Sequence, residues 1–276
     1  MLSTLNQKTA TRIRLTYRDI TRTLRLLPKF LIIGAARSGT TSLYSYLIRH
    51  PLVGAPSHKE LHFFDLNFNR ELKWYQRHFP AALPGTRKSL ITGEASPYYL
   101  FHPAVAERVR KTLPNVKLIV LLRNPIDRAY SQHQLACRQG REDITFEEAI
   151  DLEQKRIADA HKRIEKDPEY RNASHRHHSY LARGLYAEQL ERWYKYFPRE
   201  QFLIIQSEKF FIDPPAVYND VLEFLELPTY ELGEYRAFNQ KPYEGISPET
   251  HKELRDYFMN PNRQLELLLN RKFTWD

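Results

Sequence analysis

An apolar run that ends in a glycine-containing turn and then enters a helical pattern constrains the fold of this chain most strongly. Residues 30–33 are Phe-Leu-Ile-Ile, and a helical pattern over residues 40–49 follows the turn. A short run that is apolar on both faces is typical of a strand buried in a parallel sheet. Similar runs recur at residues 116–122 and 202–205, residues 90–94 are a further candidate strand, and longer amphipathic stretches separate these segments. This alternation predicts an α/β fold, in which helices flank a parallel sheet on both faces.

The stretches between the expected strands have the spacing of amphipathic helices. Proline is expected to interrupt a helix, because its ring removes a backbone donor and clashes with the preceding turn. We therefore expect a break at Pro261. The predicted helices cover residues 40–49, 68–79, 103–112, 126–138, 146–164, 179–197, 214–226 and 248–269.

Length and composition narrow the class of protein. A chain of 276 residues with 42% hydrophobic residues contains enough apolar material for one sizeable core, which argues against disorder. The single cysteine, Cys137, excludes an intrachain disulfide, and no apolar stretch approaches the ~20 residues that span a bilayer. These features predict a cytoplasmic protein without stable membrane insertion.

The excess of positive charge is concentrated at one end of the chain. The net charge is +9, yet seven basic residues and only one acidic residue, Asp19, lie in the first 29 positions. A domain that binds duplex nucleic acid would spread its basic residues over the folded body, so nucleic acid is a poor interpretation. We expect a basic helical segment over residues 1–28, followed by one domain over residues 29–276. The segment is expected to pack on that domain, with a membrane-surface contact or an organelle transit peptide as alternatives.

The turn after the first predicted strand has the character of a phosphate-binding loop. Its sequence is Gly34-Ala-Ala-Arg-Ser-Gly-Thr-Thr, and backbone N–H groups at the start of a helix bind phosphate readily. The spacing of Gly34 and Gly39 matches the ATP-binding P-loop, so the predicted sheet is P-loop-like. Thr40 stands where that loop has lysine, and Arg37 supplies a cation inside the loop instead. A P-loop kinase or NTPase is therefore the second choice, and a tight turn without ligand is the simplest alternative.

A second candidate anion site follows the most apolar strand. Arg123 lies at its carboxyl end, where open α/β sheets bind ligands, and Ser131 lies two helical turns further on. A forked guanidinium and a hydroxyl suit a phosphate monoester. Arg128, between them, is as well explained by a role in stabilising the fold.

Taken together, these motifs resemble those of sulfotransferases that use 3′-phosphoadenosine 5′-phosphosulfate (PAPS), in the heparan-sulfate-type branch. The resemblance covers residues 29–276. It rests on the loop at 34–41, on Lys59-Glu-Leu-His-Phe-Phe-Asp65, on Gly93-Glu-Ala-Ser-Pro-Tyr-Tyr99, on Arg123-Asn-Pro-Ile-Asp-Arg-Ala-Tyr-Ser131, and on Arg183-Gly-Leu-Tyr with Trp193 downstream. It implies transfer of a sulfuryl group to a hydroxyl or amine, with release of adenosine 3′,5′-bisphosphate (PAP) and without a metal.

The resemblance also implies where the nucleotide binds. The 5′-phosphate side falls on Arg37, Ser38, Gly39, Thr40 and Thr41, and the 3′-phosphate side on Arg123 and Ser131. A late basic loop over residues 239–243 would bring Lys241 to the 3′-phosphate. Family members usually have lysine at the position of Arg37. Arginine keeps the charge but does not release its proton, so Arg37 is expected to stabilise the leaving phosphate electrostatically.

Glu60 takes the general-base position by resemblance, and His62 is the competing candidate because its pKa lies near neutrality. Desolvation beside two phenylalanines is expected to raise the pKa of Glu60. Lys59 is expected to line the same cleft and to share stabilisation of the leaving group.

The acceptor is expected to be a small molecule or a glycan. The imidazole-rich segment at residues 175–178 is predicted to be a solvated loop, because it lacks the partners of a strong zinc site. His177 and His178, with His62, are the candidate acceptor contacts. The sequence leaves open the oligomeric state and the choice between O- and N-sulfation.

Overall fold

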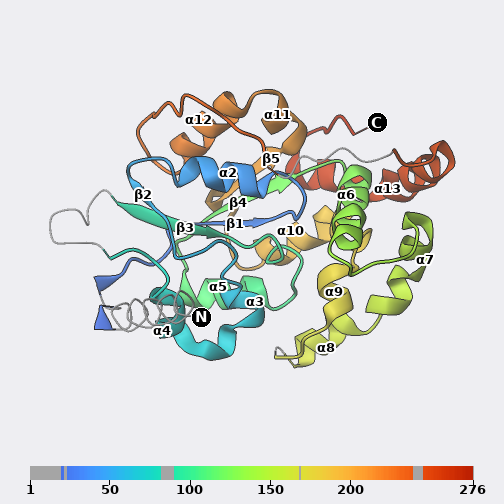
Figure 1. Ribbon diagram of the computed structural model, residues 1–276, viewed down its shortest axis with the longest axis horizontal. Helices are drawn as coiled ribbons and strands as arrows, with labels where there is room; N and C mark the ends of the chain where they lie inside the picture. The colour runs from blue at the N-terminus through green and yellow to red at the C-terminus, as the bar shows by residue number, and fades with distance from the viewer. Residues whose placement is uncertain (1–19, 22–23, 82–89, 168, 239–244, 276) are drawn as a thin grey trace, which may run out of the picture.

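The computed structural model describes residues 20–275, apart from 22–23, 82–89, 168 and 239–244. Within these residues a parallel five-stranded sheet has the order β2-β3-β1-β4-β5, with β1 at its centre (Figure 1). The expected α/β class is confirmed. The strands are β1 (Phe30–Gly34), β2 (Val53–Gly54), β3 (Ile91–Ala95), β4 (Lys117–Leu122) and β5 (Phe202–Gln206).

Helices cover both faces of the sheet, because alternate residues of each strand point to opposite sides. Leu31 of β1 lies in one apolar core and Ile32 in the other. In Figure 1 one face carries α2 (Thr40–Leu47), α11 (Ser207–Ile212) and α12 (Pro214–Phe224). The other carries α3 (Phe63–Leu66), α4 (Glu71–Gln76), α5 (Val105–Thr112) and α10 (Tyr186–Tyr194).

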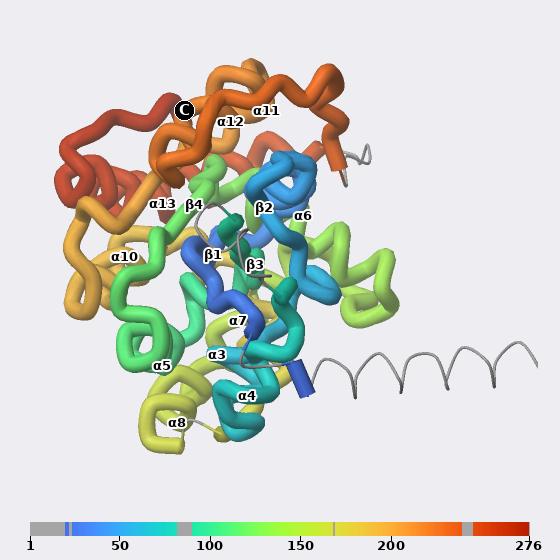
Figure 2. Tube along the Cα trace, turned by 90° about the vertical axis from the view of Figure 1, so that its left-hand side faces the viewer, coloured from blue at the N-terminus to red at the C-terminus, as the bar shows by residue number. Residues whose placement is uncertain are grey.

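A group of helices stands beside the sheet on the side where β4 ends (Figures 1 and 2). A third apolar core joins α6 to α7 and α13 through residues such as Tyr130, Phe146 and Phe258. The group comprises α6 (Pro125–Arg138), α7 (Phe146–Ile157), α8 (Ala160–Lys166), α9 (Ala173–His177) and α13 (Pro248–Leu269). Elsewhere in the fold, short 3-10 turns occupy Phe68–Arg70, Ala182–Gly184 and Arg199–Gln201.

The predicted break at Pro261 is wrong, because α13 runs unbroken from Pro248 to Leu269. The proline removes one donor, which would have bonded to the carbonyl of Tyr257. Tyr257 is 47% exposed, so water can satisfy that carbonyl.

Two predicted helices are shorter than their periodicity indicates. Residues 146–164 form α7 and α8 instead of one helix, and residues 179–185 precede α10 as irregular structure and a 3-10 turn. Gly184 explains the second case. A Cβ at this position would lie 2.7 Å from a ring atom of Phe258 and 2.8 Å from Pro125, so this turn packs directly on α6 and α13.

The amino-terminal prediction falls largely outside the described residues, as does Lys241. Where the chain is described, Arg25 is buried and donates a 2.7 Å hydrogen bond to the carbonyl of Phe79. Among the helices that are described, none is long and apolar enough to cross a membrane.

Candidate active site

The loop between β1 and α2 is a concave turn held from two sides. The amide of Ala35 donates to the carbonyl of Leu121 on β4 at 2.7 Å, and Ser207 Oγ donates to the carbonyl of Ser38 at 2.9 Å. Arg37 and Gly39 have φ values of 72° and 90°. Such left-handed residues turn successive N–H groups toward one point and create an anion-binding concavity.

Gly39 is required at its position for two reasons. Its positive φ disfavours any side chain, and a Cβ would lie 2.9 Å from a ring atom of Phe211. Helix α2 begins at Thr40 without a side-chain cap, so its first N–H groups remain available to a ligand. Ser38 is fully buried, and its Oγ has no hydrogen-bond partner among the described residues. A buried hydroxyl without a partner at a helix start is suited to a phosphate oxygen.

The structure brings Arg37, Arg123 and Ser131 together. Arg37 Nε donates to Ser131 Oγ at 3.0 Å, and Arg123 Nη1 donates to the carbonyl of Arg37 at 3.3 Å. These residues follow the carboxyl ends of β1 and β4, which are neighbours in the sheet. Arg128 takes no part: it is fully buried and donates to Gln132 and to the carbonyl of Tyr180, which supports its role in the fold.

A charged cluster lies at the start of α3, near the end of β3. Lys59 Nζ is 2.5 Å from Glu60 Oε1, and Glu60 Oε2 is 3.5 Å from His62 Nε2. Nδ1 of His62 is 2.7 Å from Oδ2 of the buried Asp65, one helical turn on. The amide of His62 approaches Ser96 Oγ at 3.5 Å, and Ser96 directly follows β3. The cluster therefore borders the same edge of the sheet as the phosphate-binding loop.

The expected rise in the pKa of Glu60 is wrong. Partial burial acts to raise it, but hydrogen bonds with His62 and Lys59 outweigh this effect and lower the pKa to about 2. His62 moves the opposite way: burial acts to lower its pKa, but hydrogen bonds to Asp65 and Glu60 raise it to about 9, while Arg176 opposes the rise. The proton affinity of the cluster therefore resides on His62 rather than Glu60.

The solvated loop predicted at residues 175–178 is also wrong, because residues 173–177 form α9 and His175 is fully buried. Its ring stacks on Phe101 with centroids 4.5 Å apart. Arg192 Nη2 lies 3.0 Å from His161 Nε2, His161 Nδ1 lies 2.8 Å from His175 Nε2, and His175 Nδ1 contacts the hydroxyl of Tyr98 at 2.5 Å. Arginine only donates, so the chain runs from Arg192 through both imidazoles to Tyr98, with both rings neutral.

The two predicted acceptor histidines lie at the last residue of α9 and directly after it, and both make hydrogen bonds to Arg141. His177 Nδ1 is 3.2 Å from Arg141 Nη1, and His178 Nε2 is 3.1 Å from the carbonyl of Arg141. Burial, followed by the charge of Arg141, lowers the pKa of His177 to about 4. Both are thus placed beside a cation, and no contact given by the structure joins them to Glu60.

Sequence reasoning missed Arg176, whose Nη2 lies 3.2 Å from Nε2 of His62. No local pattern identifies it, since the two residues are far apart in sequence and α9 was not predicted. It also gave no role to Asp65, although the spacing of three from His62 places both on one turn of helix.

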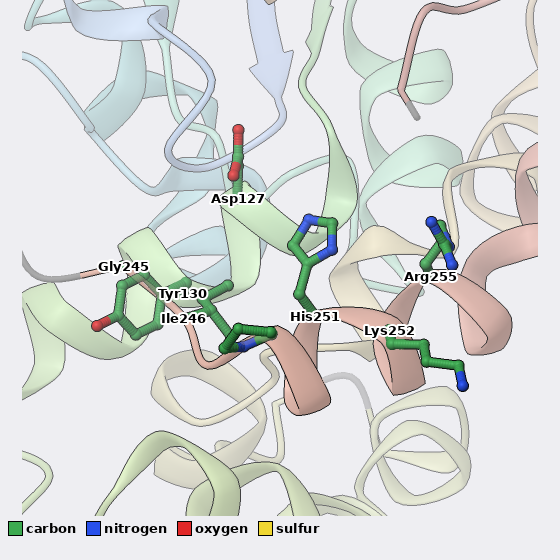
Figure 3. A pocket seen from close by; sticks show the side chains of 8 residues that line it. Asp127, Tyr130, Gly245, Ile246, His251, Lys252 and Arg255 are labelled. Atoms are coloured by element: carbon green, nitrogen blue, oxygen red, sulfur yellow. The ribbon is translucent and has the colours of Figure 1, made fainter.

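A pocket of about 440 Å³ opens between α6 and the start of α13 (Figure 3). Asp127 and Tyr130 line it from α6, and His251, Lys252 and Arg255 line it from α13. Asp127 Oδ2 is 3.7 Å from Arg123 Nη2, so the pocket adjoins the arginine that follows β4. Basic side chains outnumber the single carboxylate, which suits an anionic group. Within the described part of the chain, no group of three or more His, Cys, Asp or Glu side chains is arranged to hold a metal ion.

The fold and the loop define the class: an α/β protein with a P-loop-like turn after β1 and a charged cluster at the same edge of the sheet. Residues 27–245 match the sulfotransferase domain family. The chain belongs to this family of transferases.

Similar proteins agree with this assignment. A sulfotransferase from Alicyclobacillus acidocaldarius has a TM-score of 0.74 and 32% identity, covering 90% of this chain and 98% of its own. The membrane-associated sulfotransferase kil1 of Dictyostelium discoideum is 30% identical, covering 91% of this chain and 67% of that protein. The human bifunctional heparan sulfate N-deacetylase/N-sulfotransferase 3 is 36% identical over 81% of this chain, which spans 25% of that protein.

Proposed function

We propose that this sulfotransferase takes the sulfuryl group from PAPS and transfers it to a hydroxyl or amine of a glycan or small-molecule acceptor, releasing PAP. The observation that carries the proposal is the meeting of Arg37, Arg123 and Ser131 at the ends of adjacent strands. PAP carries two phosphates on one ribose, so two anion sites in direct contact suit it better than the single chain of phosphates in ATP. No metal is needed, because arginines and backbone N–H groups supply the positive charge.

On the 5′ side, the N–H groups of Gly39, Thr40 and Thr41 and the hydroxyl of Ser38 would hold the phosphate. Arg37 would neutralise the charge that builds on the leaving oxygen as the S–O bond breaks. On the 3′ side, Arg123 and Ser131 would bind the second phosphate. Lys241, outside the described residues, is proposed to join them.

On the acceptor side, Glu60 would take the proton as the acceptor oxygen or nitrogen forms its bond to sulfur. A carboxylate with a pKa of about 2 holds a proton poorly, whereas His62 lies 3.5 Å away with a pKa of about 9. We propose that Glu60 contacts the acceptor and passes the proton to neutral His62. Lys59, paired with Glu60, would keep the carboxylate ionised and help to stabilise the leaving group.

Turnover should then depend on the neutral form of His62. Because protonated His62 cannot accept the proton, kcat is expected to increase as pH rises toward about 9 and to level off above it. A pH profile governed by Glu60 would instead be flat over this range. The profile, measured with saturating PAPS, distinguishes the two candidate bases.

Two experiments test the function itself. Thermal-shift measurements are expected to show stabilisation by PAP and not by ATP with Mg²⁺, since a ligand that binds the folded state raises its stability. Selective stabilisation by ATP with Mg²⁺ would favour a kinase instead. Mass spectrometry of glycan and small-molecule acceptors incubated with PAPS is expected to detect an added sulfonate. A cytoplasmic location stays a prediction from the single cysteine.

A further inference from the structure

Two contacts at Nε2 of His62 require opposite protonation states. The guanidinium of Arg176 lies 3.2 Å from this nitrogen and can only donate, so the nitrogen must carry a lone pair. Glu60 Oε2 lies 3.5 Å from the same nitrogen and, as an ionised carboxylate, can only accept. Nδ1 is committed to Asp65 at 2.7 Å in either case. Arg176 and Glu60 therefore compete for one atom, and the shorter contact belongs to Arg176.

The position of Arg176 is fixed by the packing of α9. Asn172 caps the helix, accepting from the amide of His175 at 2.8 Å. The buried Arg183 donates to the carbonyl of Arg176 at 2.6 Å. Gln132, on the same helix as Ser131, donates to the carbonyl of His177 at 3.1 Å. An acceptor at the start of α9 and two donors at its end thus place the guanidinium beside His62.

We propose that Arg176 is a positioning residue that favours the neutral form of His62, in which the proton lies on Nδ1 and the lone pair of Nε2 can take the acceptor's proton. The inference rests on the proposed function, in which His62 is the final proton acceptor. When the proton arrives through Glu60, Nε2 becomes a donor, the contact with Arg176 breaks, and the contact with Glu60 forms. No bond other than that of the transferred proton is made or broken at His62.

The charges around His62 set the direction of the effect. Asp65 on α3 and Glu60 on the preceding loop favour the protonated ring, and Arg176 on α9 opposes it. Burial raises the pKa of Glu94 on β3 to about 8, so this carboxyl group favours the protonated ring only at higher pH, once it is ionised. Lys59 is paired with Glu60 and reduces the pull of that carboxylate. Removing Arg176 leaves the carboxylates unopposed, so His62 keeps its proton to higher pH.

The test compares Arg176→Met, which removes the donor and the charge, with Arg176→Lys, which retains both. The matched control is Arg171→Met. Arg171 precedes α9 and donates to the carbonyl of Leu66, yet it has no contact with His62 among those that the structure gives. The readouts are the pH profile of kcat with saturating PAPS and the Michaelis constant for PAPS.

Arg176→Met is expected to move the midpoint of the kcat profile upward by about one pH unit, which is a loss of about tenfold in kcat at neutral pH. Arg176→Lys should keep the midpoint close to that of the wild type. The Michaelis constant for PAPS should stay within about twofold in all variants. An unmoved midpoint in Arg176→Met, or an equal shift in Arg171→Met, would overturn the proposal.

A second measurement uses the wild-type protein alone, without PAPS or a sulfuryl acceptor. A ¹⁵N NMR titration of the wild-type protein is expected to show Nε2 of His62 losing its proton near pH 9 while Nδ1 stays protonated. A ring that stays doubly protonated well above pH 9 would contradict the role of Arg176. Failure to detect sulfuryl transfer, with this titration observed, would instead count against the proposed function alone.

Discussion

The glycine-containing loop after β1 and the charged cluster at the start of α3 lie at the same edge of the sheet but are built differently. Apart from Arg37, the loop is made of backbone groups and short side chains, and its shape follows from Gly39 and the start of α2. The cluster is made of charged side chains whose proton affinities depend on one another. Changes in the loop should therefore affect nucleotide affinity, and changes in the cluster should affect turnover and its pH dependence.

Replacing Glu60 by glutamine should have the largest effect. It tests whether the cluster affects turnover without affecting nucleotide affinity. The amide cannot accept the acceptor's proton, so kcat is expected to fall by about 10²- to 10⁴-fold, the range for loss of a general base. Affinity for PAP, measured by calorimetry, should be unchanged. Glu107→Gln, at an exposed carboxylate paired with Lys111, serves as the control and should be fully active. A tenfold loss of PAP affinity in Glu60→Gln would break the division.

Gly39→Ala tests the loop after β1. The methyl group meets Phe211 at 2.9 Å and the backbone has a φ of +90°, so the loop must move or strain. At roughly 1–3 kcal/mol of strain, PAP affinity is expected to fall by about 10- to 100-fold, with kcat at saturating PAPS largely retained. The control is Gly140→Ala, because Gly140 has a φ of +64° and open space around it. This substitution strains the backbone without a steric contact, and the variant should bind PAP normally. Loss of kcat without loss of affinity would contradict the account.

The buried histidine chain predicts a pH dependence of stability that is separate from catalysis. Burial, followed by nearby cations, lowers the pKa of His161 to about 4, and burial with His161 and Arg183 lowers that of His175 to about 2. The unfolded chain, with histidines near 6.5, takes up protons first as pH falls. The contribution of these two neutral histidines to the stability of the folded state is therefore fully present above about pH 6.5. It declines as pH falls toward 4, which lowers the thermal midpoint by several degrees. His161→Gln should reduce this decline, and His251→Gln should leave it as it is.

The smallest effect is expected for the two histidines next to Arg141. Replacing His177 and His178 by alanine should raise the Michaelis constant for the acceptor by a few-fold and leave PAPS affinity unchanged. The reason is that both lie at the carboxyl end of α9, as its last residue and the one after it. This helix reaches the cluster through Arg176 and does not contact Arg37 in any hydrogen bond that the structure gives. Steady-state kinetics with each substrate varied in turn would decide. Equal loss for both substrates would indicate a structural role.

The strands and the turn after β1 could be predicted because each depends on adjacent residues. Apolar runs such as Leu118 to Leu122 identify β4 directly, and the spacing of Gly34 and Gly39 identifies the turn. The pairing of Arg37 with Ser131 follows once β1 and β4 are neighbours. The sequence therefore predicts the nucleotide side with few assumptions.

The acceptor side could not be predicted in the same way, because its properties arise from contacts between distant segments. The low pKa of Glu60 results from two hydrogen bonds that exist only in the folded chain. The charged and polar residues around His175 predict a solvated segment, yet His175 is buried against Phe101 and Tyr98. Arg176 reaches His62 only because α9 forms. Tertiary contacts overrode local pattern in each case.

The most direct test of the central claim is calorimetry of PAP against 5′-AMP, which lacks the 3′-phosphate, on the wild type and on Arg123→Met. If Arg37, Arg123 and Ser131 hold two phosphates of one nucleotide, the wild type should prefer PAP by more than about tenfold, as a charge-assisted contact contributes roughly 1.5–3 kcal/mol. Arg123→Met should lose most of this preference and keep its affinity for 5′-AMP. Equal affinity of the wild type for the two nucleotides would contradict the account.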